Sequence, residues 1–371
     1  MTHNWTYKKL GEMVNIRTGK LDANAANEGG KYPFFTCSRE PLRIDTYSYD
    51  CECVLVAGNG ELNVKYYKGK FDAYQRTYII EKKPEVDYIS TYYIYLFFQK
   101  YIDVLRKGSI GGIIKYIKLG DLTNAIIPIP SLDEQQAIVR ELDAINRLID
   151  LQEEQLREYD RLAQSLFYTT FGDPVSNPKG WEVKKLGEIC VNITDGDHMP
   201  PPKTENGIPF ITISNVDKEQ NRISFENTFF VSSEYYESIK KEKRAQIGDV
   251  LYTVTGSYGI PIVVDFNRRF CFQRHIGLIR PVKEQLLPRY LACWLKSEDG
   301  MRQADMKATG IAQKTVSLAS LKGFNIPLPP LALQQSFAAQ IEAIEQQKTL
   351  IRRSLDETRT LLAARMQYYF E

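Results

Sequence analysis

The feature that most constrains the fold of this 371-residue chain is an internal duplication. The segment WTYKKLGE, which begins at Trp5, returns as WEVKKLGE from Trp181, a shift of 176 residues. Later in each copy, IPIPSLDEQQ begins at Ile127 and IPLPPLALQQ begins at Ile326, a shift of 199 residues. Because the order of the matching blocks is preserved while the shift grows, we predict two copies of one unit, with insertions in the second.

Two shorter matches lie between these ends. Gln75-Arg76 matches Gln273-Arg274 at a shift of 198 residues, and Lys115 matches Lys314 at a shift of 199. These matches predict that polar residues occupy corresponding positions in the two copies.

Each Pro-rich segment leads into a long amphipathic pattern. Proline favours an extended entry and is excluded from a helix interior, so we expect a helix to begin just after it. Apolar residues then recur at spacings of four and three over about four heptads, which is the coiled-coil period. A helix of roughly 35–38 residues, on the order of 50–55 Å long, needs a second long helix to cover its apolar face, and the other copy supplies one. The predicted seam residues are Ile138, Leu142, Ile145, Ile149, Leu156, Phe337, Ile341, Ile344, Ile351, Leu355 and Leu362.

The segments before these helices indicate globular blocks of mixed structure. Short β-branched runs from Glu52 and from Asp249 end in Gly-rich turns, which is typical of strands. Aromatic segments from Tyr88 and from Arg289 have helical spacing, and we expect them in the core. The prediction is therefore an α+β chain with two tandem, pseudo-symmetric globular domains of mixed α/β content, each followed by a long helix. The predicted domains are 1–131 and 172–330, and the helices are 132–171 and 331–371.

Composition excludes several classes of protein. The formal net charge is +2 and 43% of residues are hydrophobic, which is typical of globular proteins. The N-terminal residues lack the apolar core of a signal peptide and no stretch is apolar enough to span a bilayer, so we expect a soluble, cytoplasmic protein. Six cysteines without a C-x-x-C pair, together with three histidines, favour neither a disulfide framework nor a zinc site.

Motifs of catalysis are also missing from the sequence. The chain has no G-x-x-x-x-G-K-[ST] phosphate loop, and Gly58-Asn59-Gly60 lacks the rest of a dinucleotide-binding fingerprint. The run DGDH at Asp195–His198 contains metal-ligand residue types, but its Asp-Gly pair and the prolines that follow favour an ordinary loop. We therefore predict a chain without catalytic residues, cofactor or metal.

Taken together, the pattern resembles the specificity subunit of type I restriction-modification systems. The resemblance covers essentially the whole chain and is carried by the two Pro-Gln-Gln helix entries, the two W-x-x-K-K-L-G-E starts and NGIPFITISNV from Asn206. It implies that each globular block is a target recognition domain for double-stranded DNA and that the helices pack as an antiparallel coiled coil. It also implies a non-catalytic subunit that carries two methyltransferase subunits, which bind S-adenosylmethionine, and motor-endonuclease subunits.

Two related but non-identical domains are expected to recognise two different short sequences with an unread gap between them. Arginine can bond guanine and glutamine can bond adenine through two hydrogen bonds each, whereas lysines in the Gly-containing stretches 107–115 and 307–314 are expected to contact phosphates. The alternative for each residue is a structural role inside its domain. The candidate DNA-binding residues are Asn59, Gln75, Arg76, Lys107, Lys115, Ser257, Tyr258, Gln273, Arg274, His275, Lys307, Gln313 and Lys314.

An alternative for the whole chain is a coiled-coil adaptor whose duplicated domains bind ligands other than DNA. That alternative predicts no salt-dependent binding to duplex DNA. The first helical segment, 132–171, has four Lys and Arg against nine Asp and Glu. Its acidic character suits methyltransferase partners better than DNA.

Overall fold

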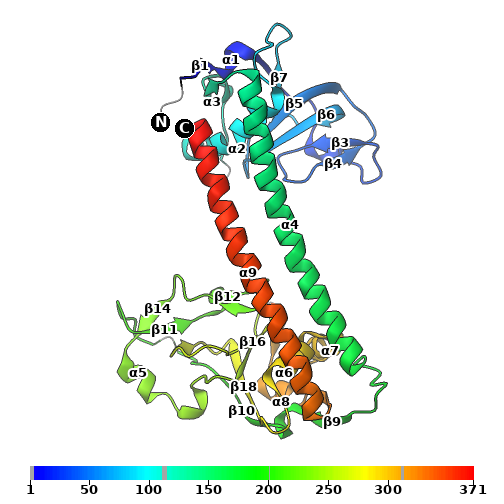
Figure 1. The fold of residues 1–371 in the computed structure, drawn as a ribbon, viewed down its shortest axis with the longest axis vertical. Coiled ribbons are helices and arrows are strands. Elements are labelled where there is room, and N and C mark those ends of the chain that lie inside the picture. Colours follow the sequence, from blue (N-terminus) through cyan, green and yellow to red (C-terminus); the bar gives the residue numbers. More distant parts are fainter. Residues whose placement is uncertain (1–3, 111–114, 200, 311–312) are drawn as a thin grey trace. The chain divides into compact units, whose positions relative to one another are not determined.

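The computed structural model describes residues 4–110, 115–199, 201–310 and 313–371 (Figure 1). The chain divides into two compact units: unit 1 comprises residues 1–154 and 352–371, and unit 2 comprises residues 155–351. Each long helix therefore contributes one part to each unit. Among the described residues, no helix combines the length and apolar character that crossing a membrane requires.

Unit 1 is built on a six-stranded sheet with the strand order β2-β7-β5-β6-β3-β4. Neighbouring strands are antiparallel except β3 and β6, which are parallel. A separate antiparallel pair, β1 and β8, joins the beginning of the block to its end. The strands are β1 (Thr6–Lys9), β2 (Val14–Thr18), β3 (Tyr32–Phe35), β4 (Leu42–Ile44), β5 (Tyr49–Ala57), β6 (Val64–Ala73), β7 (Thr77–Lys82) and β8 (Ile126–Ile129). The helices of this block are α1 (Leu10–Met13), the 3₁₀ helix η1 (Ala23–Ala25), α2 (Thr91–Gly108) and α3 (Leu119–Thr123).

Unit 2 has two sheets, with the orders β10-β18-β15-β16 and β14-β11-β17. An antiparallel pair of β9 and β21 joins the beginning of this block to its end. The strands are β9 (Glu182–Lys185), β10 (Cys190–Asp195), β11 (Ile208–Ile211), β12 (Val216–Asp217), β13 (Arg222–Ile223), β14 (Phe229–Val231), β15 (Val250–Thr253), β16 (Pro261–Val263), β17 (Cys271–Phe272), β18 (Ile276–Pro281), β19 (Ala308–Thr309), β20 (Thr315–Val316) and β21 (Asn325–Leu328). The helices are η2 (Leu186–Glu188), η3 (Ile213–Asn215), α5 (Ser233–Ser238), η4 (Lys241–Lys243), α6 (Pro288–Lys296), α7 (Glu298–Lys307) and α8 (Leu318–Lys322).

The two blocks share one topology, which confirms the duplication. The parallel pairing of Phe34 with Asp72 in unit 1 has its counterpart in the parallel pairing of Phe210 with Cys271 in unit 2. The ten-residue strand β6 corresponds to the two short strands β16 and β17, so the single sheet of unit 1 becomes two sheets in unit 2. The β12–β13 hairpin and α5 are insertions in the second copy, as the growing shift predicted.

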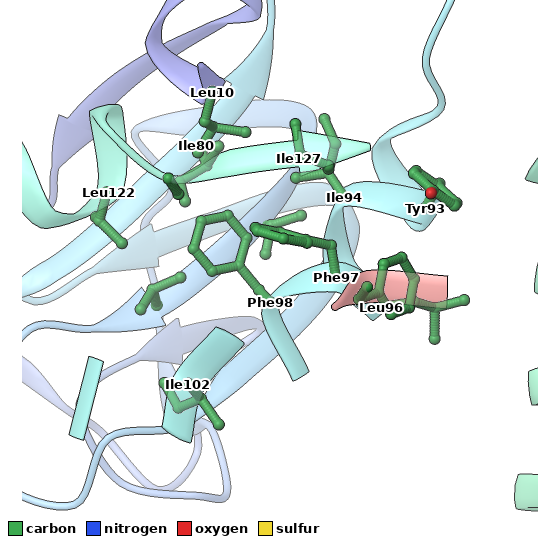
Figure 2. Close-up of a cluster of buried hydrophobic side chains, with 14 of the residues drawn as sticks. Leu10, Ile80, Tyr93, Ile94, Leu96, Phe97, Phe98, Ile102, Leu122 and Ile127 are labelled. Carbon is green, nitrogen blue, oxygen red and sulfur yellow. The ribbon is translucent and has the colours of Figure 1, made fainter. Parts of the chain in front are cut away.

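The core of unit 1 is packed around helix α2. The Oγ of Ser90 accepts a hydrogen bond from the backbone N–H of Tyr93 at 3.1 Å, which satisfies one of the free amides at the helix start. Figure 2 shows Tyr93, Phe97 and Phe98 gathered with apolar side chains from α1, α3 and β8. Tyr93 is 0% exposed and Phe97 is 1% exposed, which confirms that the aromatic segment is core. Trp294 of α6, at 0% exposure, has the same role in unit 2.

The two long helices are α4 (Leu132–Phe171) and α9 (Leu331–Phe370), each of 40 residues, and they confirm the predicted helical segments. In unit 1, the hydroxyl of Tyr369 donates to the Glu141 carboxylate at 2.6 Å, and Gln152 donates to Ser354 Oγ at 2.8 Å. The later residue of α4 thus contacts the earlier residue of α9, so the two helices are antiparallel in unit 1.

The same direction holds in unit 2. The Lys348 ammonium lies 2.7 Å from the Asp160 carboxylate, and the rings of Phe171 and Phe337 have centroids 4.9 Å apart. In each unit, therefore, the beginning of one long helix packs beside the end of the other. This antiparallel packing agrees with what the resemblance implied.

The predicted seam residues lie on the covered sides of both helices. Seven of them are buried and four are half-buried. The buried ones are Ile138, Leu142, Ile145, Phe337, Ile341, Ile344 and Leu355, and the half-buried ones are Ile149, Leu156, Ile351 and Leu362. The polar residues Gln152, Lys348 and Thr358 are buried with them.

The first glutamine of each Pro-Gln-Gln motif has a structural role. Gln135 is only 1% exposed. Its Oε1 accepts a hydrogen bond from the backbone N–H of Ser90 at 3.0 Å. Its Nε2 donates to the carbonyls of Tyr88 at 2.8 Å and Pro130 at 2.9 Å. One side chain thus satisfies three backbone groups and ties the start of α4 to the start of α2.

Gln334 makes the same three bonds in unit 2. It is 0% exposed, accepts from the backbone N–H of Leu287 at 2.9 Å, and donates to the carbonyls of Gln285 and Pro329 at 2.9 Å each. Buried polar groups are costly unless they are paired. In both copies, the glutamine at this position supplies partners to three backbone groups that would otherwise be unpaired. The second glutamine of each motif is exposed.

Candidate nucleic-acid interface

Three segments of unit 1 meet beyond the end of strand β5. The backbone N–H of Gly58 donates to the carbonyl of Arg76 at 2.8 Å, and that of Gly60 donates to the carbonyl of Lys115 at 3.0 Å. The backbone N–H of Ile117 donates in return to the carbonyl of Gly58 at 3.0 Å. The β5–β6 turn, the β6–β7 turn and the segment before α3 therefore form one connected surface, which we call the loop surface of unit 1.

Unit 2 builds its loop surface with the same hydrogen bonds. The backbone N–H of Val254 donates to the carbonyl of His275 at 2.9 Å, and that of Gly256 donates to the carbonyl of Lys314 at 3.0 Å. The backbone N–H of Val316 donates in return to the carbonyl of Val254 at 2.8 Å. Because the bonds run through backbone atoms, the two copies keep this scaffold although the side chains differ.

A fourth segment joins each loop surface through a glycine. A Cβ atom at Gly19 would lie 2.1 Å from the carbonyl oxygen of Ala73, and one at Gly196 would lie 1.9 Å from the carbonyl oxygen of Phe272. Any side chain at these positions would collide with backbone, so only glycine permits the contact.

Gly196 of the DGDH run is therefore required for this close packing. The run begins at Asp195, the last residue of β10, and continues as a loop from Gly196. His198 Nε2 lies 2.9 Å from Asp195 Oδ2. The described residues contain no group of three or more His, Cys, Asp or Glu side chains arranged to hold a metal ion.

The backbone corrects the predicted match between the β6–β7 turn and its counterpart. The N–H of Gln75 donates to the carbonyl of Leu21 at 2.9 Å, and the N–H of Arg274 donates to the carbonyl of Asp197, also at 2.9 Å. Gln75 is thus equivalent to Arg274 at a shift of 199 residues, and the match of Gln75 with Gln273 at a shift of 198 is wrong by one residue. A shared Gln-Arg dipeptide is too short to define an alignment, whereas backbone hydrogen bonds do define it.

The candidates of unit 1 lie on or beside its loop surface. Gln75, Arg76 and Lys115 are exposed, and Asn59 is half-buried in the β5–β6 turn. Within the described part of the chain, the side chains of Asn59, Arg76 and Lys115 make no hydrogen bond or ion pair. Lys107 is exposed in the last turn of α2, where a cation complements the helix dipole.

Two candidates of unit 2 have partners inside their own domain. The hydroxyl of Tyr258 donates to Asp305 at 2.7 Å, and this bond raises the pKa of Tyr258. The Lys307 ammonium donates to the carbonyl of Gly323 and lies 5.3 Å from the centroid of the Phe324 ring. The structural alternative therefore has direct support at both positions.

The remaining candidates of unit 2 gather at its loop surface. A Cβ atom at Gly256 would lie 3.1 Å from Gln313 Nε2, so the Gln313 side chain covers this turn. Exposed members are Ser257, Arg274, Gln313 and Lys314, and half-buried members are Gln273 and His275. Of the Gly-containing stretches predicted to contact phosphates, residues 111–114 and 311–312 lie outside the described residues.

Two further lysines lie at these surfaces, and the sequence analysis did not identify them as candidates. Lys218, on the inserted β12–β13 hairpin, donates to Ser257 Oγ at 2.7 Å. No repeat match covers the insertion, so no sequence signal pointed to Lys218. Lys20 is exposed and directly follows Gly19, and the required glycine is the signal that could have found it.

Burial suppresses the reactivity of the thiols in three of the six cysteines. Burial raises the pKa of the thiols of Cys190, Cys271 and Cys293 to about 12. Thiols in that state remain protonated at neutral pH and are poor nucleophiles.

A cleft of about 980 Å³ lies elsewhere in unit 2. Aromatic residues such as Phe225 and Phe266 line it together with charged residues such as Arg289 and Glu342. None of the thirteen candidate DNA-binding residues lines this cleft.

Comparison with known families gives one match that covers most of the chain. Residues 2–159 and 178–358 match the family model described as the type I restriction modification DNA specificity domain. The two matched segments correspond to the two copies of the duplicated unit.

Curated relatives carry related names. The specificity subunit of the type I restriction enzyme EcoDI from Escherichia coli is 42% identical over 142 residues, which are 38% of this chain and 31% of that subunit. The specificity subunit of MjaVIII from Methanocaldococcus jannaschii is 22% identical over 374 residues, covering 92% of this chain and 86% of that subunit. The chain thus matches about a third of the first relative's length and most of the second's.

Solved structures show the same fold. The S subunit of a type I restriction-modification system from M. genitalium has a TM-score of 0.62 at 16% identity, covering 99% of this chain and 96% of that one. A chain from a structure of type I system assembly and conformational transition has a TM-score of 0.57 at 21% identity, covering 99% of this chain and 97% of that one.

Proposed function

The chain belongs to the family of type I restriction modification DNA specificity domains, and on that premise we propose that it is the DNA-recognition subunit of a type I restriction-modification complex. In this proposal each unit binds double-stranded DNA and recognises one short sequence. The two sequences differ and are separated by an unread gap of fixed length, so the complete target is bipartite and asymmetric.

The observation that carries the proposal is one backbone scaffold with two sets of side chains. The β6–β7 turn presents Gln75 and Arg76 in unit 1, where its counterpart presents Arg274 and His275 in unit 2. Side chains that enter the major groove distinguish base pairs by their hydrogen-bonding groups. Equal scaffolds with different polar side chains are what recognition of two different sequences requires.

Exposed cations on the loop surfaces support contact with phosphates. They include Lys20, Arg76 and Lys115 in unit 1 and Arg274 and Lys314 in unit 2. Contacts to phosphates position a protein on DNA and supply most of its salt-dependent affinity. Since the whole chain has a net charge of only +2, this local arrangement matters more than the total charge.

The proposal assigns the chemistry to partners. Two methyltransferase subunits, which bind S-adenosylmethionine, would modify the target, motor-endonuclease subunits would cleave unmodified DNA, and this chain would catalyse neither reaction. The basis for these partners is the family membership together with the surface of the long helices.

Exposed leucines on α4 and α9 support two equivalent docking sites. Leu151 and Leu350, which are 199 residues apart, are 58% and 61% exposed. Leu162 and Leu361, with the same separation, are 52% and 49% exposed. Each of these exposed leucines therefore has a counterpart on the other long helix. Two sets of exposed leucines related by the internal repeat suit two copies of one partner.

We expect Leu151→Arg and Leu350→Arg each to remove one methyltransferase subunit, and the double variant to remove both. Native mass spectrometry of the co-expressed complex measures the stoichiometry, with the exposed Gln335→Arg as the control. Acidic residues of α4 are less suitable for this test, because Glu153 forms an ion pair with Arg359 at 2.8 Å. A double variant that retained two methyltransferase subunits would contradict these docking sites.

Mapping of methylated adenines tests the function itself. Cells that express this chain with its methyltransferase subunits should carry methylation at a two-part motif with a fixed gap. Fluorescence anisotropy of the complex on a duplex with that motif should show affinity that falls steeply with salt. Absence of a two-part methylated motif would refute the proposal, and absence of salt-dependent binding to duplex DNA would favour a ligand-binding adaptor.

A further inference from the structure

The corrected alignment makes one position of the β6–β7 turn comparable between the units. We propose that residues 75 and 274 are equivalent base-contacting positions, at which Gln75 contacts adenine in one half of the target and Arg274 contacts guanine in the other. This inference rests on the proposed function and adds to it one specific position and two specific bases.

The backbone places both residues at the same point of the same turn. In unit 1 the N–H of Thr77 donates to the carbonyl of Tyr74 at 2.8 Å, which makes Gln75 the first central residue of a four-residue turn. In unit 2 the N–H of Ile276 donates to the carbonyl of Gln273 at 3.0 Å, which makes Arg274 the first central residue.

Each turn is also fixed to its neighbours on both sides. The residue before Gln75 bonds to Phe35 at 2.9 Å, and the residue before Arg274 bonds to Ile211 at 3.0 Å, in both cases from backbone N–H to carbonyl. Together with the bonds to Leu21 and Asp197, these contacts hold the two turns in the same place within their units. The backbone that carries each side chain is therefore held in place before any ligand binds.

The amide of Gln75 has the donor and the acceptor that adenine requires. Its Nε2 donates to Asp22 Oδ1 at 3.3 Å, which distinguishes the nitrogen from the oxygen end of the amide. The second N–H and the Oε1 atom remain available, and adenine presents an acceptor at N7 and a donor at N6 in the major groove. One glutamine therefore satisfies both atoms of that base.

Arg274 offers the complementary chemistry. Its Nε lies 3.4 Å from His275 Nε2, and its side chain makes no ion pair within the described residues. The two terminal nitrogens of the guanidinium remain available as donors. Guanine presents two acceptors, O6 and N7, to a pair of such donors.

The experiment exchanges the two side chains in the full complex. Gln75→Arg should replace adenine by guanine at one position of one half of the methylated motif, and Arg274→Gln should replace guanine by adenine in the other half. Methylation mapping gives the motif, and competition binding on duplexes that differ at that base pair should show a preference that reverses, with each bidentate contact contributing about 5- to 150-fold discrimination.

Two alanine variants serve as controls, one for loss of folding and one for a purely electrostatic effect on binding. Gln75→Ala should still fold, as judged by thermal unfolding, and should accept any base at that position. Lys115→Ala is the matched control on the same surface, because loss of a phosphate contact weakens binding to all sequences alike and reduces the salt slope by about one.

The possible outcomes separate this inference from the function on which it rests. A wild-type complex with no two-part motif would refute the function. A wild-type two-part motif that stays unchanged in the exchange variants, changes in both halves at once, or weakens uniformly as in Lys115→Ala would overturn the base assignment and leave the function standing.

Discussion

Replacing Gln334 by leucine tests why the Pro-Gln-Gln motif occurs twice. The amide of Gln334 is 0% exposed and bonds to the backbone groups of Leu287, Gln285 and Pro329. Leucine has nearly the same size but no polar atoms. The Gln334→Leu variant therefore leaves one buried N–H and two buried carbonyls without their partner.

The magnitude follows from the cost of unpaired buried groups. At about 1.5 kcal/mol each, three such groups cost about 4–5 kcal/mol. The apolar side chain of leucine offsets about 1–2 kcal/mol, since it no longer desolvates an amide. We therefore expect the free energy of unfolding of unit 2 to fall by about 3 kcal/mol, which lowers the unfolding temperature of a domain of roughly 200 residues by about 6–12 °C.

Calorimetry of the full chain measures the unfolding temperature, and hydrogen exchange locates the effect. The backbone N–H of Leu287 should lose protection in Gln334→Leu, whereas the equivalent N–H of Ser90, which bonds to Gln135, should keep it. The reciprocal variant Gln135→Leu should reverse this pattern. Gln335→Leu changes the exposed neighbour and is the matched control.

An equal, small effect of Gln334→Leu and Gln335→Leu would refute this reasoning. So would a large loss of stability in which the Leu287 amide kept its protection. Either result would mean that the motif is retained for a reason other than satisfaction of buried backbone groups.

Two further predictions concern the long helices. The hydrogen bond from Arg365 holds the pKa of Glu141 below its ordinary value of 4.5, so this carboxylate stabilises the fold above that pH and the stabilisation is lost as the pH falls through the lowered pKa. Urea unfolding over a pH series should therefore show a smaller acid-induced loss of stability in Glu141→Gln than in the wild type, and equal pH dependence would count against the bond. The side chain of Lys348 is 4% exposed and pairs with Asp160 and Glu345, whose side chains are 51% and 29% exposed and stay in contact with water when the lysine is removed. Lys348→Met should keep the free energy of unfolding within about 1 kcal/mol of the wild type or raise it. Lys348→Ala should lower it by about 2 kcal/mol, because the smaller side chain leaves a cavity. Thermal unfolding measures both variants, and equal losses would show that the charge itself stabilises the helices.

The candidate site divides between what sequence reasoning could and could not predict. Gly-bounded turns with exposed polar residues were predictable, because glycine and its neighbours mark turns through local chemistry. Tyr258 and Lys307 looked equally available in the sequence, yet each has a partner inside unit 2. Their partners, Asp305 and Gly323, are brought near by packing, which no local pattern encodes.

Lys218 is a functional candidate that the sequence did not predict, and the reason is again tertiary packing. It lies 39 residues before Ser257 in the chain, and its contact with that residue depends on how the inserted hairpin folds back over unit 2. A residue inside an insertion has no counterpart in the other copy. Sequence comparison within the chain therefore passes over it.

The sequence by itself determined the duplication, the two long helices and the positions where they begin. Helical periodicity arises from contacts between residues three and four apart, and proline acts on its immediate neighbours, so both leave a signal that is local in the chain. Only the tertiary structure decided that Gln75 corresponds to Arg274 and that one glutamine of each pair is buried. Those facts depend on hydrogen bonds between segments that are distant in the chain, and such bonds leave no spacing in the sequence by which they could be recognised.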